Sequence, residues 1–420
     1  MIAEFKVRNF LSFKEEQILS FEASSDKNLQ EYHCVEVNPD ERILRVAMIY
    51  GANASGKSNL LLAIDFLREI SLISKNRDEK TGFIPFRFDD TTIHEPGSFK
   101  ISIYIKTIKY IYSVVLDADL IYEEKLVYYP GKQPATVFHR EHNINENDYI
   151  LKTGSTIKIS PVELAVLKSN TLNNMTLLSG LSKTNIKFSV LQSVYDWFSK
   201  SLSEIIRPAH MLYRQTISNI VNNEPGFKQF VLESLENADF NIADIQVDSE
   251  GIQYNNGQTG YAGYDIVSDN TERYERKQVY FIHNASGKQT RLSINLQSSG
   301  TLQYIGLLGK LKSIIDNSSV LNVDELENSL HPDLVNYFIN NFLYHSKKEN
   351  AQSQFIFTTH NVGLLAEDFV RKDIVWFTEK KEDGSTHLFS LDDFDIRKNL
   401  SFLKAYQAGK FGAVPNLGII

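Results

Sequence analysis

A glycine-rich loop followed by lysine and serine is the stretch of this sequence whose residue types point most directly to chemistry. An apolar run at residues 46–50 leads into residues 51–58, which read G-x-x-x-x-G-K-S, and an apolar helical pattern follows at once. Glycines let the backbone turn tightly around an anion, and the loop amides and the N-terminus of the next helix then point at a phosphate group. In that context Lys57 can reach the β- and γ-phosphates of a nucleoside triphosphate, and Ser58 can bind Mg²⁺. The predicted binding residues are Gly51, Ala52, Asn53, Ala54, Ser55, Gly56, Lys57, Ser58 and Asn59.

A pair of acidic residues closes a short apolar run much further along the chain. Residues 319–323 predict a buried strand, and Asp324 and Glu325 follow it directly. In a phosphate-loop ATPase a carboxylate at the end of a strand holds Mg²⁺, and an adjacent glutamate can act as general base on the attacking water. The alternative is an acidic pair in a solvated turn, but the apolar strand in front of it favours a site. We therefore predict Asp324 and Ser58 as metal ligands and Glu325 as a catalytic residue.

Two weaker patterns flank the acidic pair. Ser298, Ser299 and Gly300 stand just before a helical pattern. Such a run offers amides and hydroxyls to an anion, but it is also a common helix cap. Downstream, an apolar run at residues 354–359 ends on His360, which is either a structural histidine at a strand end or a contact to the γ-phosphate. Each pattern taken alone leaves both interpretations open.

The elements that must position these residues follow from the spacing of apolar side chains. Alternation predicts strands, with an antiparallel meander among them, at residues 2–13, 17–21, 43–50, 99–105, 110–115, 126–129, 242–247 and 278–283. Helical spacing predicts helices at residues 57–71, 188–206 and 227–235. Polar composition predicts loops at residues 23–40 and 254–274, and residues 138–158 alternate only weakly between polar loops.

Composition limits the class of protein. The 420 residues are 42% hydrophobic and 23% charged with a net charge of −8, which is ordinary for a soluble protein and gives no global attraction to nucleic acid. The single cysteine, Cys34, excludes an intramolecular disulfide and suits a reducing cytosol. No apolar run reaches the length of about 18 residues expected of a membrane span, and the N-terminus lacks a signal-peptide pattern. We therefore expect a cytoplasmic protein without membrane contact.

The order of these motifs resembles the soluble branch of the ABC-type ATPase superfamily, which includes SMC, RecF and Rad50 heads. The resemblance implies that residues 51–58 are the Walker A motif, 297–301 the signature motif and 320–325 Walker B, with His360 as the switch histidine. In that superfamily two heads sandwich ATP, and the signature of one covers the γ-phosphate held by the other. The implied cofactors are therefore ATP and Mg²⁺, and Ser298, Ser299 and Gly300 would act in trans in a homodimer or higher homo-oligomer.

The same resemblance predicts an α/β fold. An ABC-type ATPase head would combine a phosphate-loop parallel sheet with an antiparallel β meander and carry an α-helical insertion. Residues 1–155 would form the N-terminal half with Walker A, residues 156–275 the mainly helical insertion, and residues 276–420 the C-terminal half with the signature, Walker B and His360. The signature departs from the transporter sequence Leu-Ser-Gly-Gly-Gln, because it reads Gln-Ser-Ser-Gly-Thr, and no Q-loop glutamine is assigned.

Residues 5–13, 324–332 and 406–415 narrow the resemblance to AAA family ATPases of bacterial phage defence, of the AbiL/RloA type and related to the ATPase of PARIS-like systems. This implies a sensor or switch that controls a separate effector, a nuclease, in abortive infection, with only indirect contact to nucleic acid. The stretch after His360 is shorter than a small domain of about 100 residues, so we expect no fused nuclease. The alternative is a RecF/Rad50-like ATPase that acts directly on DNA in repair or recombination. It shares every ATPase motif, and the charge of −8 argues against it.

Overall fold

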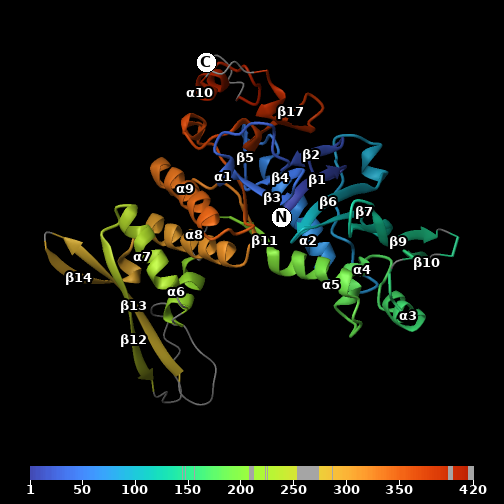
Figure 1. Ribbon diagram of the computed structural model, residues 1–420, viewed down its shortest axis with the longest axis horizontal. Helices are drawn as coiled ribbons and strands as arrows, with labels where there is room; N and C mark the ends of the chain where they lie inside the picture. The colour runs from blue at the N-terminus through green and yellow to red at the C-terminus, as the bar shows by residue number, and fades with distance from the viewer. Residues whose placement is uncertain are drawn as a thin grey trace. The chain divides into compact units, whose positions relative to one another are not determined.

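The computed structural model (Figure 1) divides into two compact units. Unit 1 comprises Met1–Arg207, Asn317–Leu326 and Leu343–Ile420, and unit 2 comprises Pro208–Asp316 and Glu327–Phe342. Among the residues that the structure describes, no helix is long and apolar enough to cross a membrane. Those residues are 1–143, 145–146, 148–155, 157–207, 212–222, 224, 226–252, 274–285, 287–395 and 401–414.

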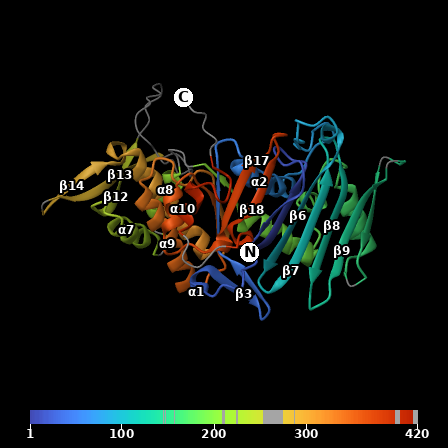
Figure 2. The same cartoon turned by 90° about the horizontal axis from the view of Figure 1, so that it is seen from above.

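Seven antiparallel strands form the larger sheet of unit 1. Their order across the sheet is β10-β9-β8-β7-β6-β1-β2, and Figure 2 shows β6 to β9 as long neighbouring strands. Side chains along β7 alternate between buried and partly exposed positions, as in an antiparallel sheet with one face on the core. The strands are β1 (Ile2–Arg8), β2 (Gln17–Ser20), β6 (Gly97–Ile105), β7 (Ile108–Leu116), β8 (Ile121–Tyr129), β9 (Ala135–Asn143) and β10 (Asp148–Thr153).

A six-stranded, mainly parallel sheet carries the phosphate loop. Its order is β11-β15-β16-β5-β17-β18, and only the pair β17–β18 is antiparallel. Every residue of β5 is buried, as expected for a strand inside a parallel sheet. Because β15, β16, β5 and β17 run in the same direction, the residues after them gather at one edge of the sheet. The strands are β5 (Val46–Gly51), β11 (Leu202–Ile206), β15 (Val320–Val323), β16 (Gln354–Thr358), β17 (Val375–Lys380) and β18 (Thr386–Ser390).

Helix α2 (Lys57–Leu72) begins directly after the phosphate loop. It buries Leu60, Ile64 and Leu67, whose spacing places them on one face, and it contacts β5 and β11. The other helices of unit 1 are α1 (Gln30–His33), α3 (Pro161–Ser169), α4 (Leu177–Leu181), α5 (Ser189–Asp196), the π-helix η2 (Trp197–Ser201) and α10 (Phe402–Gln407). Short 3₁₀ turns are η1 (Thr92–His94), η4 (Val362–Ala366), η5 (Lys372–Ile374) and η6 (Leu391–Asp393), and a small hairpin joins β3 (Cys34–Asn38) to β4 (Glu41–Leu44).

Unit 2 combines helices with a three-stranded antiparallel sheet. The sheet consists of β12 (Ile242–Ile252), β13 (Tyr274–Ala285) and β14 (Lys288–Ser293), and Figure 1 shows it beside α7 (Phe227–Asn237), which contacts β12. Helix α6 (Tyr213–Val221) packs closely on α8 (Ser299–Asp316), because Gly309 of α8 leaves no room for a Cβ against Thr216. The 3₁₀ turn η3 (Ile294–Leu296) precedes α8, and α9 (Pro332–Lys348) is shared between the two units.

The predicted fold class is confirmed: the chain is α/β, with the phosphate loop on a parallel sheet and a separate antiparallel meander. One predicted helix is wrong in its second half. Residues 188–206 form α5 and η2, but the chain then extends into β11, an edge strand that pairs with β15. Leu202 and Ile206 are buried there, so pairing with the sheet overrides the helical spacing of the apolar residues.

Smaller errors have the same origin in tertiary pairing. Residues 43–50 do not form one strand, because β4 pairs with β3 whereas β5 joins the parallel sheet. The supposed loop 23–40 contains α1 and β3, and residues 138–158 contain β9 and β10 of the large sheet. The predicted loop 254–274 falls outside the described residues except for Tyr274, which begins β13. The boundaries of the proposed insertion at 156–275 stay a prediction.

Candidate functional site

The phosphate loop connects the end of β5 to the start of α2, and its backbone requires glycine at one position in particular. Gly56 has a φ of 105°, in the left-handed region that side chains rarely adopt. A Cβ at this position would also lie 2.2 Å from Thr386 Oγ1 and 2.9 Å from Ser12 Oγ. The second glycine of the motif is therefore required both by its backbone conformation and by the close approach of neighbouring side chains.

Hydrogen bonds from β17 and β18 hold the loop in this shape. Ser55 Oγ lies 2.6 Å from Thr378 Oγ1 of β17, and Thr386 Oγ1 of β18 donates to the Ser55 carbonyl at 2.8 Å. On the helix side, Asn59 Nδ2 donates to Ser12 Oγ at 2.8 Å. Ser55 and Asn59, both predicted to bind the nucleotide, thus also fasten the loop to its surroundings.

Lys57 is buried inside the loop that it belongs to. Its Nζ donates to the carbonyl oxygens of Gly51 and Ala52 at 2.9 and 3.0 Å. These two bonds hold the ammonium group against the backbone of the loop. Gly51 and Ala52 accept these bonds but do not line the cavity that residues 53–59 border.

The two predicted metal ligands lie together: Ser58 is at the start of α2, which follows β5, and Asp324 follows β15, two strands away in the sheet. Ser58 Oγ donates to Asp324 Oδ1 at 2.9 Å, and Thr358 Oγ1 donates to the same oxygen at 2.7 Å. Within the described residues there is no cluster of three or more His, Cys, Asp or Glu side chains that could hold a metal by itself. One hydroxyl and one carboxylate fit Mg²⁺, which prefers oxygen ligands and keeps several waters and substrate phosphates in its shell.

Glu325 and His360 follow neighbouring strands and line the same cavity as the phosphate loop. Glu325 has a φ of 54°, a conformation that few residues other than glycine adopt. Its backbone N–H donates to Thr358 Oγ1 at 2.7 Å, so one threonine fixes both acidic residues. The structure therefore brings together Lys57, Ser58 and the three predicted residues from β15 and β16.

The cavity has a volume of about 540 Å³. Glu325 and His360 border it from the β15–β16 side of β5, and Lys380 and Gly384 border it from the β17–β18 side. Phe88, from the segment between α2 and β6, completes its rim. Larger cavities beside α7, of about 670 Å³, and beside α3, of about 730 Å³, lack any phosphate-loop residue.

Several residues of this site were missed from the sequence. Thr358 lies at the end of an apolar strand, and a threonine at such a position is too common to indicate a site. Arg207 lies with its Nε 3.7 Å from Asp324 Oδ2, and the helix predicted for residues 188–206 gives no sign of this position after β11. Phe88 and Lys380 come from segments that carry no recognisable motif.

The predicted signature residues belong to unit 2, at the start of α8. Ser298 caps this helix, because its Oγ accepts the backbone N–H of Thr301 at 3.1 Å. A Cβ on Gly300 would lie 2.9 Å from the Ser329 carbonyl oxygen, so this glycine permits a close approach of the backbone. Both residues thus have a structural role in unit 2, and nucleotide contact by Ser298, Ser299 and Gly300 stays a prediction.

The sequence and the structure were compared with those of known proteins. No curated protein matches the sequence. The SMC head domain from Thermotoga maritima is similar over 93% of this chain and 98% of that chain, with 14% identity and a TM-score of 0.41. An SMC head bound to the C-winged helix domain of ScpA is similar over 97% of this chain and 99% of that chain, with 15% identity and a TM-score of 0.38. Values this low support no transfer of function, residue roles or partners.

A family match is more informative. Residues 46–149 and 179–366 match the family described as "AAA domain, putative AbiEii toxin, Type IV TA system". The matched segments include the phosphate loop, the acidic pair and His360, and together they span well over half of the chain. The chain therefore belongs to this AAA domain family.

Proposed function

We propose that this chain binds ATP with Mg²⁺ at the phosphate loop, hydrolyses it, and works in the cytoplasm as a nucleotide-controlled switch. One observation carries the proposal. Lys57, Ser58, Glu325 and His360 line one cavity, and Ser58 donates to Asp324 beside it. A clamping cation, two oxygen ligands for Mg²⁺ and a carboxylate at a strand end are the groups that phosphoryl transfer to water requires.

Each side chain has a distinct role in this proposal. The Lys57 ammonium group would bind the β- and γ-phosphates, and Ser58 and Asp324 would hold Mg²⁺, which balances charge on the phosphates when bound. Glu325 would accept a proton from the attacking water. His360 would bind the γ-phosphate from the neighbouring strand end.

A second copy of the chain would complete the site. We propose that Ser298, Ser299 and Gly300, at the start of the 18-residue helix α8, cover the nucleotide of a partner copy. The backbone N–H groups at a helix N-terminus favour an anion, which supports this role.

The biological role that we propose is control of a separate effector, a nuclease, in antiphage abortive infection. Two observations support it: the family description names the AbiEii toxin of a Type IV toxin–antitoxin system, and residues 5–13, 324–332 and 406–415 resemble phage-defence ATPases. The alternative is a RecF/Rad50-like ATPase that acts on DNA directly. Salt-dependent binding of the purified chain to DNA ends would favour that alternative, whereas phage protection that requires a neighbouring nuclease gene would favour defence.

Two substitutions test the ATPase proposal. Lys57→Ala should weaken ATP binding by roughly a hundredfold, because it removes the charge that clamps the phosphates. Glu325→Gln should bind ATP normally but slow its hydrolysis by about 10²-fold or more. Calorimetry measures the first effect and release of inorganic phosphate the second, and Lys132→Ala and Glu36→Gln, both exposed and outside the cavity, serve as matched controls. Wild-type turnover in Glu325→Gln would refute its role as the base.

A further inference from the structure

The segment between α2 and β6 brings an exposed aromatic ring to the rim of the phosphate-loop cavity. Phe88 lines the cavity, and 76% of its surface is exposed. No other large hydrophobic side chain among the described residues is more exposed. Exposure of a phenyl ring costs free energy, so a ring kept in the open beside a ligand pocket suggests a ligand that covers it.

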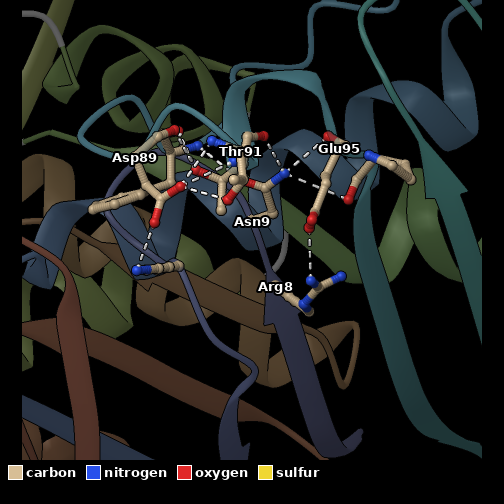
Figure 3. A network of polar contacts seen from close by, with 9 residues as sticks. Arg8, Asn9, Asp89, Thr91 and Glu95 are labelled. Carbon is tan, nitrogen blue, oxygen red and sulfur yellow. Dashed lines mark hydrogen bonds and ion pairs between the residues drawn. The ribbon is translucent and has the colours of Figure 1, made fainter.

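The backbone of this segment is firmly held, so the position of the ring is defined. Asn9, which is fully buried, donates from Nδ2 to the carbonyls of Thr92 and Glu95 at 2.8 and 2.9 Å. Its Oδ1 accepts the backbone N–H of Phe86 at 3.0 Å. Figure 3 shows the Asn9 amide within this group of contacts. One side chain of the N-terminal turn thus ties down the segment on both sides of Phe88.

Two ion pairs reinforce this arrangement. Lys14 Nζ lies 2.8 Å from Oδ2 of Asp89, the residue that follows Phe88 in the chain. Arg8 pairs with Glu95 at 2.9 Å, and Figure 3 shows this second pair. Both pairs join the segment to the stretch around β1. Residues 5–13, which resemble phage-defence ATPases, therefore have a structural role, because they hold the cavity rim.

The Phe88 ring has close neighbours in the β17–β18 hairpin and in its own segment. A Cβ on Gly384, in the turn between β17 and β18, would lie 3.3 Å from Phe88 Cδ2, so the glycine lets this turn pack close to the ring. The ring of Phe86, which is buried, lies 5.7 Å away between centroids. Lys380 Nζ stands 5.9 Å from the centre of the Phe88 ring and adds a cation at the same rim.

Different kinds of side chain border the two ends of the cavity, because these side chains come from strands on opposite sides of β5. Glu325 and His360 come from the β15–β16 side of β5, whereas Phe88 packs on the β17–β18 turn at the other side. A nucleoside triphosphate is an elongated ligand with its reacting phosphate at one end and its base at the other. With the γ-phosphate directed toward Glu325, the base lies on the side of Phe88.

We propose that Phe88 is the platform on which the nucleobase of the bound nucleoside triphosphate stacks. This inference rests on the proposed function, because it names the base-binding end of the same site. Flat π-systems stack on aromatic side chains irrespective of their hydrogen-bonding edge. Lys380 at the rim complements the negative charge of the phosphates next to the ribose.

Binding of two ligands to Phe88→Ala separates stacking from phosphate binding. The dissociation constant for ATP should rise at least about fivefold, in line with the loss of one base–aromatic stack. The dissociation constant for inorganic tripolyphosphate should stay unchanged, because this ligand has no base. Tyr344→Ala, which removes another exposed ring outside the cavity, should leave both constants unchanged. Calorimetry on the full chain measures all of them.

A tryptophan at the same position gives an optical readout. The native tryptophans, Trp197 and Trp376, are both buried, so the emission added by Phe88→Trp reports on the rim. ATP should quench this emission and tripolyphosphate should not. Unchanged ATP affinity in Phe88→Ala, equal weakening of both ligands, or equal quenching by both would overturn the inference. Failure of the wild-type chain to bind either ligand would instead overturn the proposed function.

Discussion

The two sides of the phosphate-loop cavity are built from different kinds of residue. On the β15–β16 side, Asp324, Glu325 and His360 present groups that can bind a metal or move a proton. On the β17–β18 side, Thr378 and Thr386 bind the loop itself and keep its backbone in a demanding conformation. We expect changes on the second side to disturb the shape of the loop more than changes on the first side, because Thr378 and Thr386 bond Ser55 of the loop directly. Chemistry and shape are thus maintained by separate strands.

The largest effect should come from Gly56→Ala, which disturbs the backbone conformation of the phosphate loop. The added methyl group would meet Thr386 Oγ1 at 2.2 Å, and the residue would keep a φ of 105°. Overpacking and backbone strain each cost about 1–3 kcal/mol, so the free energy of unfolding should fall by about 3 kcal/mol or more. Urea denaturation measures this loss, and ATP binding should disappear with it.

Gly131 provides the matched control for this prediction. It lies in the turn between β8 and β9, with no atom within 4 Å of a Cβ placed on it. Gly131→Ala should therefore change the free energy of unfolding by less than about 0.5 kcal/mol. If both alanine variants were equally stable, the close approach of Thr386 would not constrain the loop.

This contrast also explains what the sequence could predict. The chemical side consists of residues that follow apolar strands, so the sequence could place Asp324, Glu325 and His360 at strand ends, and their roles stay a prediction. The shape-keeping side consists of threonines inside ordinary strands, and their contacts depend on which strands are neighbours. Strand order in a parallel sheet is set by crossovers over long stretches of chain, and local spacing does not encode it.

The same reason accounts for the errors in the fold. The helix expected at residues 188–206 has correct apolar spacing, but its last five residues are β11 because β15 offers an edge to pair with. The phosphate loop, α2 and the meander were predictable, since each is specified by local pattern. Arg207 and Phe88 were not, because only tertiary structure brings them to the cavity.

Two threonine-to-valine substitutions compare the sides directly. Thr358→Val removes the hydroxyl that donates to Asp324 and accepts from the Glu325 N–H. Thr378→Val removes the partner of Ser55. Both threonines are fully buried, so each substitution should lower the free energy of unfolding by about 1–3 kcal/mol. Thr358→Val should chiefly slow hydrolysis, because it frees the acidic pair, and Thr378→Val should chiefly weaken ATP binding, because it frees the loop.

Turnover and ATP affinity, measured on both variants at a temperature where both are folded, check this division of labour. Thr386→Val extends the comparison, since it removes a second bond to Ser55 and should resemble Thr378→Val. Loss of affinity in Thr358→Val with normal turnover at saturation would reverse the assignment of the two sides.

The stability of the fold has a pH dependence of its own, which comes from a histidine outside the cavity. His33 is fully buried, and desolvation, together with the nearby Arg371 charge, lowers its pKa from 6.5 to about 4. The unfolded chain therefore binds a proton more readily, and the stability contributed by neutral His33 is present above pH 6.5 and is lost as the pH falls toward 4. The expected loss at pH 5 is about 2 kcal/mol.

Urea denaturation at pH 7 and pH 5 measures this loss. His33→Leu should flatten the pH dependence even where it lowers stability at neutral pH, because leucine has no proton to bind. His94→Gln, a substitution of an exposed histidine, should leave the slope unchanged. An identical slope in wild type and His33→Leu would remove His33 as the cause of the pH dependence.

The smallest effect on the site should come from Arg207, which lies close to Asp324 but does not line the cavity. Its Nε lies 3.7 Å from Asp324 Oδ2, and its side chain is 60% exposed, so Arg207→Gln should change stability by less than about 1 kcal/mol. A cation at that distance nevertheless competes with Mg²⁺ for the carboxylate. Its removal should lower the Mg²⁺ concentration for half-maximal ATP binding by about twofold.

Lys200→Gln removes an exposed cation that pairs with Asp196, and it should leave this concentration unchanged. A higher Mg²⁺ requirement in Arg207→Gln would mean that the guanidinium orients Asp324 for the metal, and the chemical side would then depend on β11 as well.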